Sequence, residues 1–390
     1  VTLTAHSGRR RHSGLRPSRP SWAAAAAAVS PTGTDVERGN AVIDQSSHFD
    51  WKAQWYPIAW ARDMPDGLNR ATLFDEDYVV ARTADGRVFA FADQCPHRLA
   101  ALSEGRLTST GLLQCAYHGW SFAEGGACVD VPQRSERGPP ASKRTCARAV
   151  PVREEAGLVW LLPSSEADEA SVPPPAYPRE MVSDEFKTLP AVRDLPVDYT
   201  IVLQNVVDFE HGPFAHQNVG FDLYGADEAH PMRVETTMEE CEGGTKRLRV
   251  AMRTDATPKV TARVAKGKKG DEAMMVATSV FRAPVHVETC RREAGPDGRT
   301  RFLTNFWLVP TGVGRCRFLS CSCANAPFLP PRWFLHLGLN RFLDQDTHLL
   351  ATEQQNLLPL EMAAHERGEP FVRRRDAYCH QSRGEALVMA

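Results

Sequence analysis

The chain has 390 residues, of which 42% are hydrophobic and 24% are charged, and its formal net charge is −2. A chain of this length can form two domains with substantial cores. The small net charge gives no sign of binding to nucleic acid, so we expect no nucleic-acid partner. No run of about 18 apolar residues occurs, so the sequence predicts no membrane-spanning helix.

The first 45 residues have the composition of a targeting segment. Residues 1–30 contain no Asp or Glu and are rich in Arg, Ser and Ala. Acid-poor, Arg-rich and Ser-rich leaders are typical of organellar transit peptides, so we predict a disordered transit peptide over residues 1–45. Because the chain starts with Val1 and not with Met, we also expect its start to be incomplete or processed. The alternative is a disordered tail from an imperfect gene model.

Short strands and turns follow, and we predict a β-rich first domain over residues 46–168. Strand-like residues at 78–80 and 88–91 flank the turn dipeptide Asp85-Gly86, which indicates a hairpin. Residues 158–162 read as a buried strand that closes this domain. The Pro-rich segment 172–178 cannot pair in a sheet, and we expect it to be an extended spacer at the domain boundary.

Residues 169–390 mix helix and strand, and we predict an α+β second domain with an antiparallel sheet. Residues 200–217 look helical, although Gly212-Pro213 must break or kink that helix. Residues 232–325 alternate like antiparallel strands. A long helix is predicted from about residue 332 to residue 366.

The sharpest motif is a pair of short Cys/His boxes. Cys95 is followed by His97, and Cys115 is followed by His118 after a further loop. Two thiolates for one iron and two imidazoles for the other are the ligands of a Rieske [2Fe-2S] cluster. A structural zinc site is the alternative, but zinc fingers prefer paired Cys followed by paired His. We expect Trp120, directly after the second box, to shield one flank of the cluster.

A second constellation of metal-binding residue types lies in the later part of the chain. His211 and His216 would point about 140° apart on a straight helix, and Pro213 between them supplies a reason for distortion. Two His and one carboxylate form the facial triad of non-haem iron(II) oxygenases. Projected on the long helix, Asp346 falls within an apolar stripe, where a carboxylate is costly unless paired or metal-bound. Asp344 falls on the polar face, so we predict that Asp346 is the third ligand and that Asp344 faces solvent.

Neighbouring acidic residues have separate expected roles. Asp208 lies one turn before His211 and could accept a hydrogen bond from its imidazole. Asp208 could also carry an electron or proton path from the cluster. Glu210 is a rival ligand, but its side chain should point away from His211.

Together these motifs resemble the pheophorbide a oxygenase family, which includes chlorophyllide a oxygenase and the Rieske proteins of the chloroplast inner-envelope translocon. The resemblance covers roughly residues 48–380. It rests on four short motifs. They are Gln-Trp-Tyr-Pro (54–57), Cys-Pro-His-Arg (95–98), the second Cys/His box, and Asn-x-x-Asp-x-x-His-x-x-x-x-His (205–216).

The resemblance implies a Rieske domain followed by a helix-grip (START-like) catalytic domain with a deep apolar pocket. It implies an oxygenase that uses O2 and electrons from reduced ferredoxin to oxidise a chlorophyll-derived macrocycle, in the chloroplast inner envelope or thylakoid membrane. Related enzymes form homotrimers, in which the residue matching Asp208 joins a cluster to the iron of the next subunit. The site residues carried over are Cys95, His97, Cys115 and His118 for the cluster, His211, His216 and Asp346 for a mononuclear Fe(II), and Asn205 and Asp208 as catalytic residues.

Two departures from the family pattern keep alternatives open. Family members usually continue into C-terminal membrane helices, and the sequence up to Ala390 does not include them. We therefore expect membrane association only through a C-terminal segment of that kind. Phe209-Glu210-His211-Gly212 also differs from the expected Pro-Ala-His-Val. The alternatives are an oxygenase for a smaller aromatic substrate and a translocon-like redox protein.

Overall fold

The computed structural model describes residues 50–135, 142–164, 169–172, 175–216, 232–240, 250–258, 275–293, 300–325 and 331–366. The transit peptide predicted over residues 1–45 lies outside the described residues. Across the described ranges, no helix is both long enough and apolar enough to cross a membrane.

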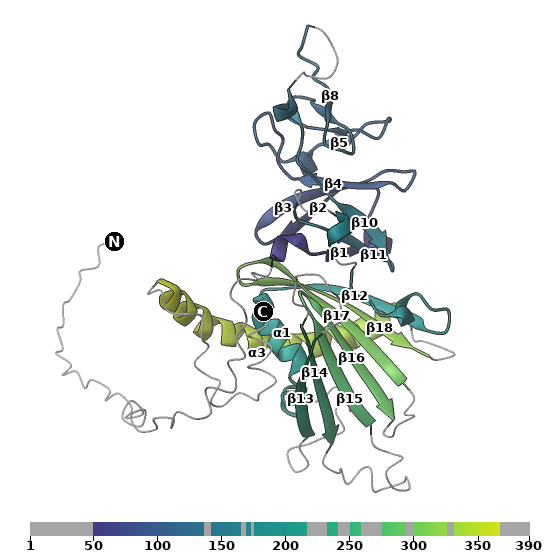
Figure 1. Cartoon of the computed structure of the whole chain (residues 1–390), viewed down its shortest axis with the longest axis vertical. Coiled ribbons are helices and arrows are strands. Elements are labelled where there is room, and N and C mark those ends of the chain that lie inside the picture. The colour runs from purple at the N-terminus through teal and green to yellow at the C-terminus, as the bar shows by residue number, and fades with distance from the viewer. Residues whose placement is uncertain are drawn as a thin grey trace, which may run out of the picture. The chain divides into compact units, whose positions relative to one another are not determined.

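Between residues 50 and 161, the described residues form strands and short 3-10 turns and no α-helix (Figure 1). Three antiparallel sheets, with strand orders β1-β11-β10, β2-β3-β4-β9 and β5-β6-β7-β8, make up this region. Their strands are β1 (Tyr56–Trp60), β2 (Gly67–Leu73), β3 (Glu76–Arg82), β4 (Val88–Ala92), β5 (Arg106–Leu107), β6 (Leu113–Gln114), β7 (Ser121–Phe122), β8 (Cys128–Asp130), β9 (Ala149–Val150), β10 (Val152–Glu155) and β11 (Leu158–Leu161).

The local predictions for this region are confirmed. Strands β3 and β4 pair as a hairpin around the predicted turn, where Gly86 has a φ of 84°. A positive φ at this position suits glycine, which has no Cβ to clash. The expected closing strand is β11, whose four residues are all buried and which pairs with both β1 and β10.

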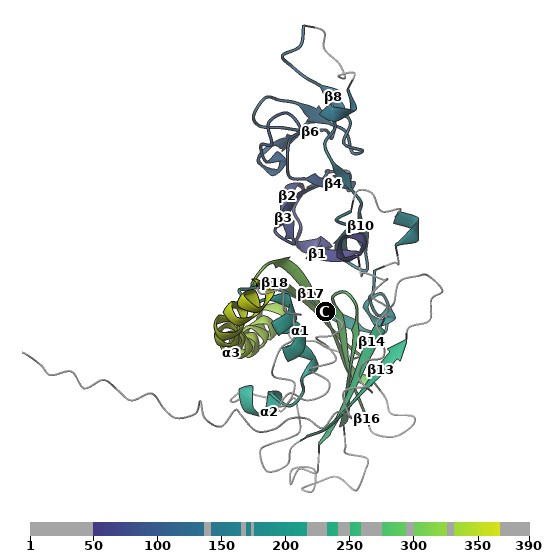
Figure 2. The same cartoon turned by 60° about the vertical axis from the view of Figure 1, so that its left-hand side comes forward.

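The later region is built on one antiparallel sheet with the strand order β12-β18-β17-β16-β15-β14-β13. The predicted α+β class is therefore confirmed. Figure 2 shows the sheet with the helices on one of its sides. The elements are β12 (Lys187–Leu195), α1 (Tyr199–Val207), α2 (Gly212–Ala215), β13 (Met232–Glu240), β14 (Val250–Pro258), β15 (Met275–Arg282), β16 (His286–Glu293), β17 (Thr300–Gly312), β18 (Arg315–Ala324) and α3 (Arg332–Glu366).

The helix predicted over residues 200–217 is wrong in its extent. Helix α1 ends at Val207, and Asp208 has an extended backbone with a φ of −90° and a ψ of 105°. The Asp208 side chain accepts a hydrogen bond from the Glu210 amide at 2.9 Å, which stabilises a turn instead of a further helical turn. Pro213 does not break a helix, because it lies in the first turn of α2, where a missing N–H costs nothing.

The two faces of the seven-stranded sheet have different neighbours. On one face, Trp307 meets Trp60 of β1 and Trp160 of β11 edge to face, with ring centroids 6.1 Å and 6.2 Å apart. On the other face, Arg193 of β12 donates to the carbonyl of Asn340 in α3 at 3.1 Å. We call this second face the helix face of the sheet.

A hairpin turn joins the first region to the later sheet. Phe74 and Asp75 connect β2 to β3, and both have a positive φ, 53° and 59°. Their amides donate to the carbonyls of Pro310 and Thr311 in β17, each at 3.0 Å. The Asp75 carboxylate also accepts from the Val313 amide at 3.0 Å. These contacts compensate for a turn conformation that Asn-Gly would adopt more easily.

Candidate metal centres

The two Cys/His boxes form two tight loops of the same design. In the first loop, the Cys95 amide donates to Ala100 and the Leu99 amide donates back to Cys95, both at 2.8 Å. In the second loop, the Cys115 amide donates to the carbonyl of Trp120 at 2.9 Å. Each loop therefore holds a buried Cys at its base and presents a His two or three residues later.

The side chains of the boxes lie together at the ends of these loops. The imidazole rings of His97 and His118 are 4.5 Å apart between centroids. Trp120 stacks on His97 at 4.7 Å with an interplanar angle of 3°, which places the indole beside the box as expected, while its shielding of a cluster stays a prediction. Both thiols are buried, and burial raises the pKa of the Cys95 thiol to about 11, so a bound cation would be needed to hold it as a thiolate.

The arrangement of the four side chains fits two metal ions better than one. Across the described ranges, the group that brings three ligand atoms within 4.8 Å of one another is His211, His216 and Asp346. The four Cys and His ligands do not reach that spacing, which a tetrahedral zinc ion would require. Two thiols at the base and two imidazoles at the tip suit the separated irons of a [2Fe-2S] cluster.

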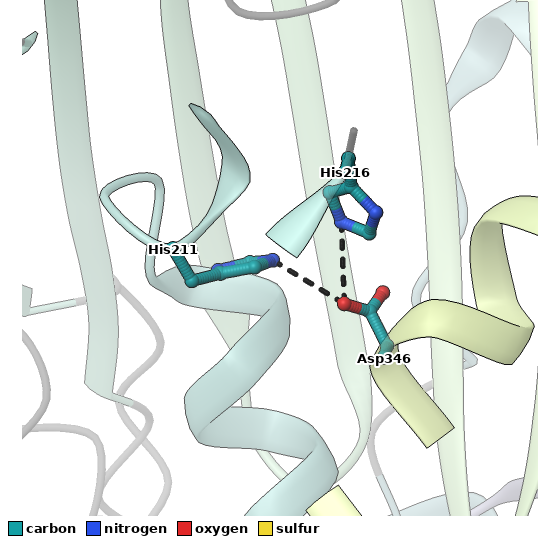
Figure 3. A group of neighbouring side chains, drawn as sticks. All are labelled: His211, His216 and Asp346. Carbon is teal, nitrogen blue, oxygen red and sulfur yellow. Dashed lines mark ion pairs between the residues drawn. The ribbon is translucent and has the colours of Figure 1, made fainter. Parts of the chain in front are cut away.

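The second site is built from both ends of α2 and from the middle of α3 (Figure 3). His211 is the N-cap residue of α2 and His216 is its C-cap residue, so the four-residue helix sets their spacing. Their Nε2 atoms lie 3.6 Å and 3.2 Å from the same carboxylate oxygen, Oδ1 of Asp346. Metal bonds of about 2.0–2.2 Å place adjacent ligand atoms about 3 Å apart, so these distances leave room for one ion.

Burial opposes charge at this second site. Burial raises the pKa of Asp346 to about 7, against a hydrogen bond from Asn205 that lowers it. Burial and the neighbouring His211 together lower the pKa of His216 to about 4. The protein alone therefore favours neutral side chains here, and a divalent cation would supply the positive charge that keeps the carboxylate ionised.

Two neighbours of His216 escaped the sequence reasoning. The His216 ring stacks on Phe342 with centroids 3.6 Å apart and an interplanar angle of 13°. Its Nδ1 lies 3.3 Å from Oε1, the side-chain amide oxygen of Gln345, which can only accept a hydrogen bond. Nδ1 is therefore the protonated nitrogen, and the Nε2 lone pair faces Asp346 and the proposed ion. Both residues precede Asp346 on α3, Phe342 by four positions and Gln345 by one.

The acidic residues near the site do not join the three proposed ligands. Asp344 is exposed, as predicted, and it also forms an ion pair with Arg193. Asp208 accepts from the Glu210 amide, while its predicted bond to His211 stays a prediction. Glu210 does not belong to the three-residue group. Asn205 contacts the site through its hydrogen bond to Asp346.

Two models of known families match parts of the chain. Residues 54–151 match the Rieske [2Fe-2S] domain, which contains both Cys/His boxes. Residues 281–361 match the pheophorbide a oxygenase domain, which contains Asp346.

Known proteins resemble the chain over most of its length. Pheophorbide a oxygenase of Arabidopsis thaliana is 30% identical over 90% of this chain and 65% of that protein. Protein TIC 55 of the same species is 29% identical over 80% of this chain and 54% of that protein. The chain thus spans about half to two thirds of the length of these relatives. Among solved structures, dicamba monooxygenase bound to 3,6-dichlorosalicylic acid has the same fold, with a TM-score of 0.64, 21% identity, and coverage of 87% of this chain and 95% of that one. The chain therefore contains a Rieske [2Fe-2S] domain and a pheophorbide a oxygenase domain, and it is similar to pheophorbide a oxygenase and TIC 55 over most of its length.

Proposed function

We propose that the chain is a Rieske-type non-haem iron oxygenase. The observation that carries this proposal is the presence of two separate metal-ligand constellations in one chain, one on short loops and one beside α3. An electron carrier needs only the first. The second, with two His and one carboxylate, is the donor set of oxygenases that activate O2 at an iron with open positions.

The residues of each site have assigned tasks. Cys95 and Cys115 hold one iron of the cluster, and His97 and His118 hold the other. His211, His216 and Asp346 hold the mononuclear iron. When bound, the cluster supplies single electrons and the mononuclear Fe(II) supplies the binding and reduction of O2.

The surrounding residues position these ligands. Asn205 donates to Asp346 and favours its ionised form. Gln345 fixes the protonated nitrogen of His216, and Phe342 holds the plane of its ring. Burial of His216 and Asp346 excludes water from that side of the site.

The proposed substrate is a chlorophyll-derived macrocycle of the pheophorbide a or chlorophyllide a type, since the relatives include pheophorbide a oxygenase. Reduced ferredoxin is the proposed electron donor. A homotrimer would bring a cluster to the neighbouring iron, with Asp208 on the path between them. The chain is assigned to the plastid, like its chloroplastic relatives, and its proposed place there is the inner envelope or thylakoid membrane.

Metal analysis of wild type beside His211→Ala tests the two sites. We expect about three irons per chain with a Rieske spectrum, and about two irons with an unchanged spectrum in the variant. His348→Ala is the control, because His348 is an exposed His on α3. Equal iron content in wild type and His211→Ala would contradict the mononuclear site and favour a redox protein that holds only the cluster.

Turnover tests the reaction itself. With ferredoxin, its reductase and pheophorbide a, the iron-loaded protein should consume O2 and form an oxygenated product. His211→Ala should keep a reducible cluster and form no product. Wild-type protein that reduces its cluster but oxygenates neither this macrocycle nor a smaller aromatic would contradict the proposal.

A further inference from the structure

A row of hydroxyl side chains crosses four adjacent strands of the seven-stranded sheet. Ser279 of β15 lies opposite Thr289 of β16, Thr289 lies opposite Thr304 of β17, and Thr304 lies opposite Ser322 of β18. Directly paired residues of antiparallel strands point to the same face, so these four side chains form one line. We name it the hydroxyl row. At about 4.8 Å per strand, the row spans about 14 Å.

The hydroxyl row lies on the helix face of the sheet. Ser322 is paired with Leu189 of β12, and Leu189 shares its face with Arg193, four residues later on the same strand. Arg193 contacts α3 through Asn340 and Asp344. The row and the helix that carries Asp346 are therefore on the same side of the sheet.

The segment that holds the proposed iron ligands packs beside this row. Phe209, two residues before His211, is buried in a cluster with Met232, Val234 and Ala277. Ala277 precedes Ser279 by two residues on β15 and shares its face, about 7 Å away. A molecule bound over the hydroxyl row would thus lie next to the segment that carries His211.

The row combines hydrogen-bonding capacity with an apolar surround. The hydroxyls of Ser279 and Thr289 are 2.7 Å apart, and those of Thr304 and Ser322 are 3.4 Å apart. Each pair holds two O–H groups and uses one, so each pair can still donate one hydrogen bond. The next row on the same face is apolar at Phe281, Val287 and Phe306. Thr289, Thr304 and Ser322 are only half-buried, although the helices lie on their side.

Helix α1 contributes an independent sign of a polar ligand. It packs against β15, β17 and β18, which carry three members of the row. Gln204 of α1 is buried, and its Nε2 donates to none of the residues that the structure describes. A buried amide without a partner is costly, and an oxygen bound between α1 and the sheet would relieve that cost.

We propose that the hydroxyl row binds an uncharged oxygen, a carbonyl or hydroxyl, on a flat apolar substrate and orients the substrate toward the mononuclear site. The four side chains carry no charge, so they suit a neutral oxygen better than a carboxylate. The apolar row beside them would contact the ring system. This inference rests on the proposed oxygenase function and specifies the substrate class of that same site.

Equilibrium binding, without turnover, tests the row. The probes are pheophorbide a and flavone, two flat ring systems of different size that both carry a carbonyl, added without O2 to the full iron-loaded chain. Valine replaces threonine with nearly the same shape, so Thr289→Val/Thr304→Val removes two hydroxyls. Thr289→Ser/Thr304→Ser keeps them. Thr278→Val is the matched control, because Thr278 neighbours Ser279 on β15 but points to the opposite face.

We expect at least one probe to bind, the double Val variant to weaken its Kd by about tenfold, and the double Ser variant and Thr278→Val to stay near wild type. Melting temperature and iron content, measured on each variant, separate this effect from the ordinary stabilisation of sheets by paired hydroxyls. Equal Kd values in all variants, or no binding of either probe by wild type, would overturn the proposal. Weaker binding by the double Val variant, together with no turnover by wild type, would support the hydroxyl row as a binding site and contradict the proposed oxygenase function.

Discussion

Replacing Gln345 by Leu should weaken the binding of Fe(II) at the mononuclear site, although all three proposed ligands are kept. In the structure, the side-chain oxygen Oε1 of Gln345 lies 3.3 Å from Nδ1 of His216 and fixes which ring nitrogen carries the proton. Leu has a similar size but cannot accept a hydrogen bond, so the His216 ring would no longer be held in the tautomer that leaves Nε2, the proposed ligand nitrogen, without a proton. Loss of such a supporting bond typically costs 10- to 100-fold in metal affinity.

The low end of that range applies here. Phe342 still stacks on the ring at 3.6 Å, so the plane of the imidazole is kept and only the proton position is lost. We therefore expect Fe(II) to bind about tenfold more weakly, which corresponds to about 1.4 kcal/mol. The effect of Phe342→Ala should be additional, because it frees the ring plane.

A titration of the metal-free mononuclear site with Fe(II), with the cluster intact, measures this difference. Gln355→Leu is the matched control, since Gln355 is an exposed glutamine on the same helix. The Rieske absorption spectrum should be identical in all three proteins. An Fe(II) affinity in Gln345→Leu equal to that of wild type would refute the role given to this side chain.

Three further predictions concern other parts of the molecule. Trp120→Ala should expose the His97 side of the cluster to water and raise its reduction potential, because the reduced cluster carries more negative charge; a redox titration followed by electron paramagnetic resonance checks this. Asp75→Ala should lower the free energy of unfolding by about 1 kcal/mol, mainly because the Val313 amide loses its acceptor, whereas Asp75→Asn should retain most of it; urea denaturation compares the two. Burial lowers the pKa of His286 to about 3, so only the unfolded chain gains this proton as pH falls below about 6.5. Between pH 7 and pH 4, wild type should therefore lose on the order of 3 kcal/mol of its free energy of unfolding through this group, and His286→Gln should not show this loss. The same dependence of the free energy of unfolding on pH in both proteins would contradict this.

The sequence predicted those features whose determinants are contiguous. The two Cys/His boxes are complete within a few residues each, and the loops around Cys95 and Cys115 are closed by their own backbone hydrogen bonds. The long helix was also predictable, because its pattern is local and continues from Arg332 to Glu366. On that helix, projection alone separated buried Asp346 from exposed Asp344, as the structure shows.

The break after α1 was less predictable, because two signals compete there. Proline and glycine suggested a break at Gly212-Pro213, yet the helix ends at Val207, where Asp208 forms its own turn. An aspartate can either continue a helix or bond to a nearby amide, and the choice depends on what packs around it. Here the burial of Phe209 against Met232 favours the turn, and that contact joins segments distant in the sequence.

The walls of a site depend on strand register, which sequence alone does not reveal. Ser279, Thr289, Thr304 and Ser322 are separated by 10, 15 and 18 positions, a spacing with no period. They become one row only because each hairpin closes in a particular register, and a slip of one residue would turn a strand's hydroxyl to the opposite face. The proposed metal ligands lie in short motifs or at positions that helix projection can identify, whereas the substrate contacts proposed for the hydroxyl row come together only in the folded sheet.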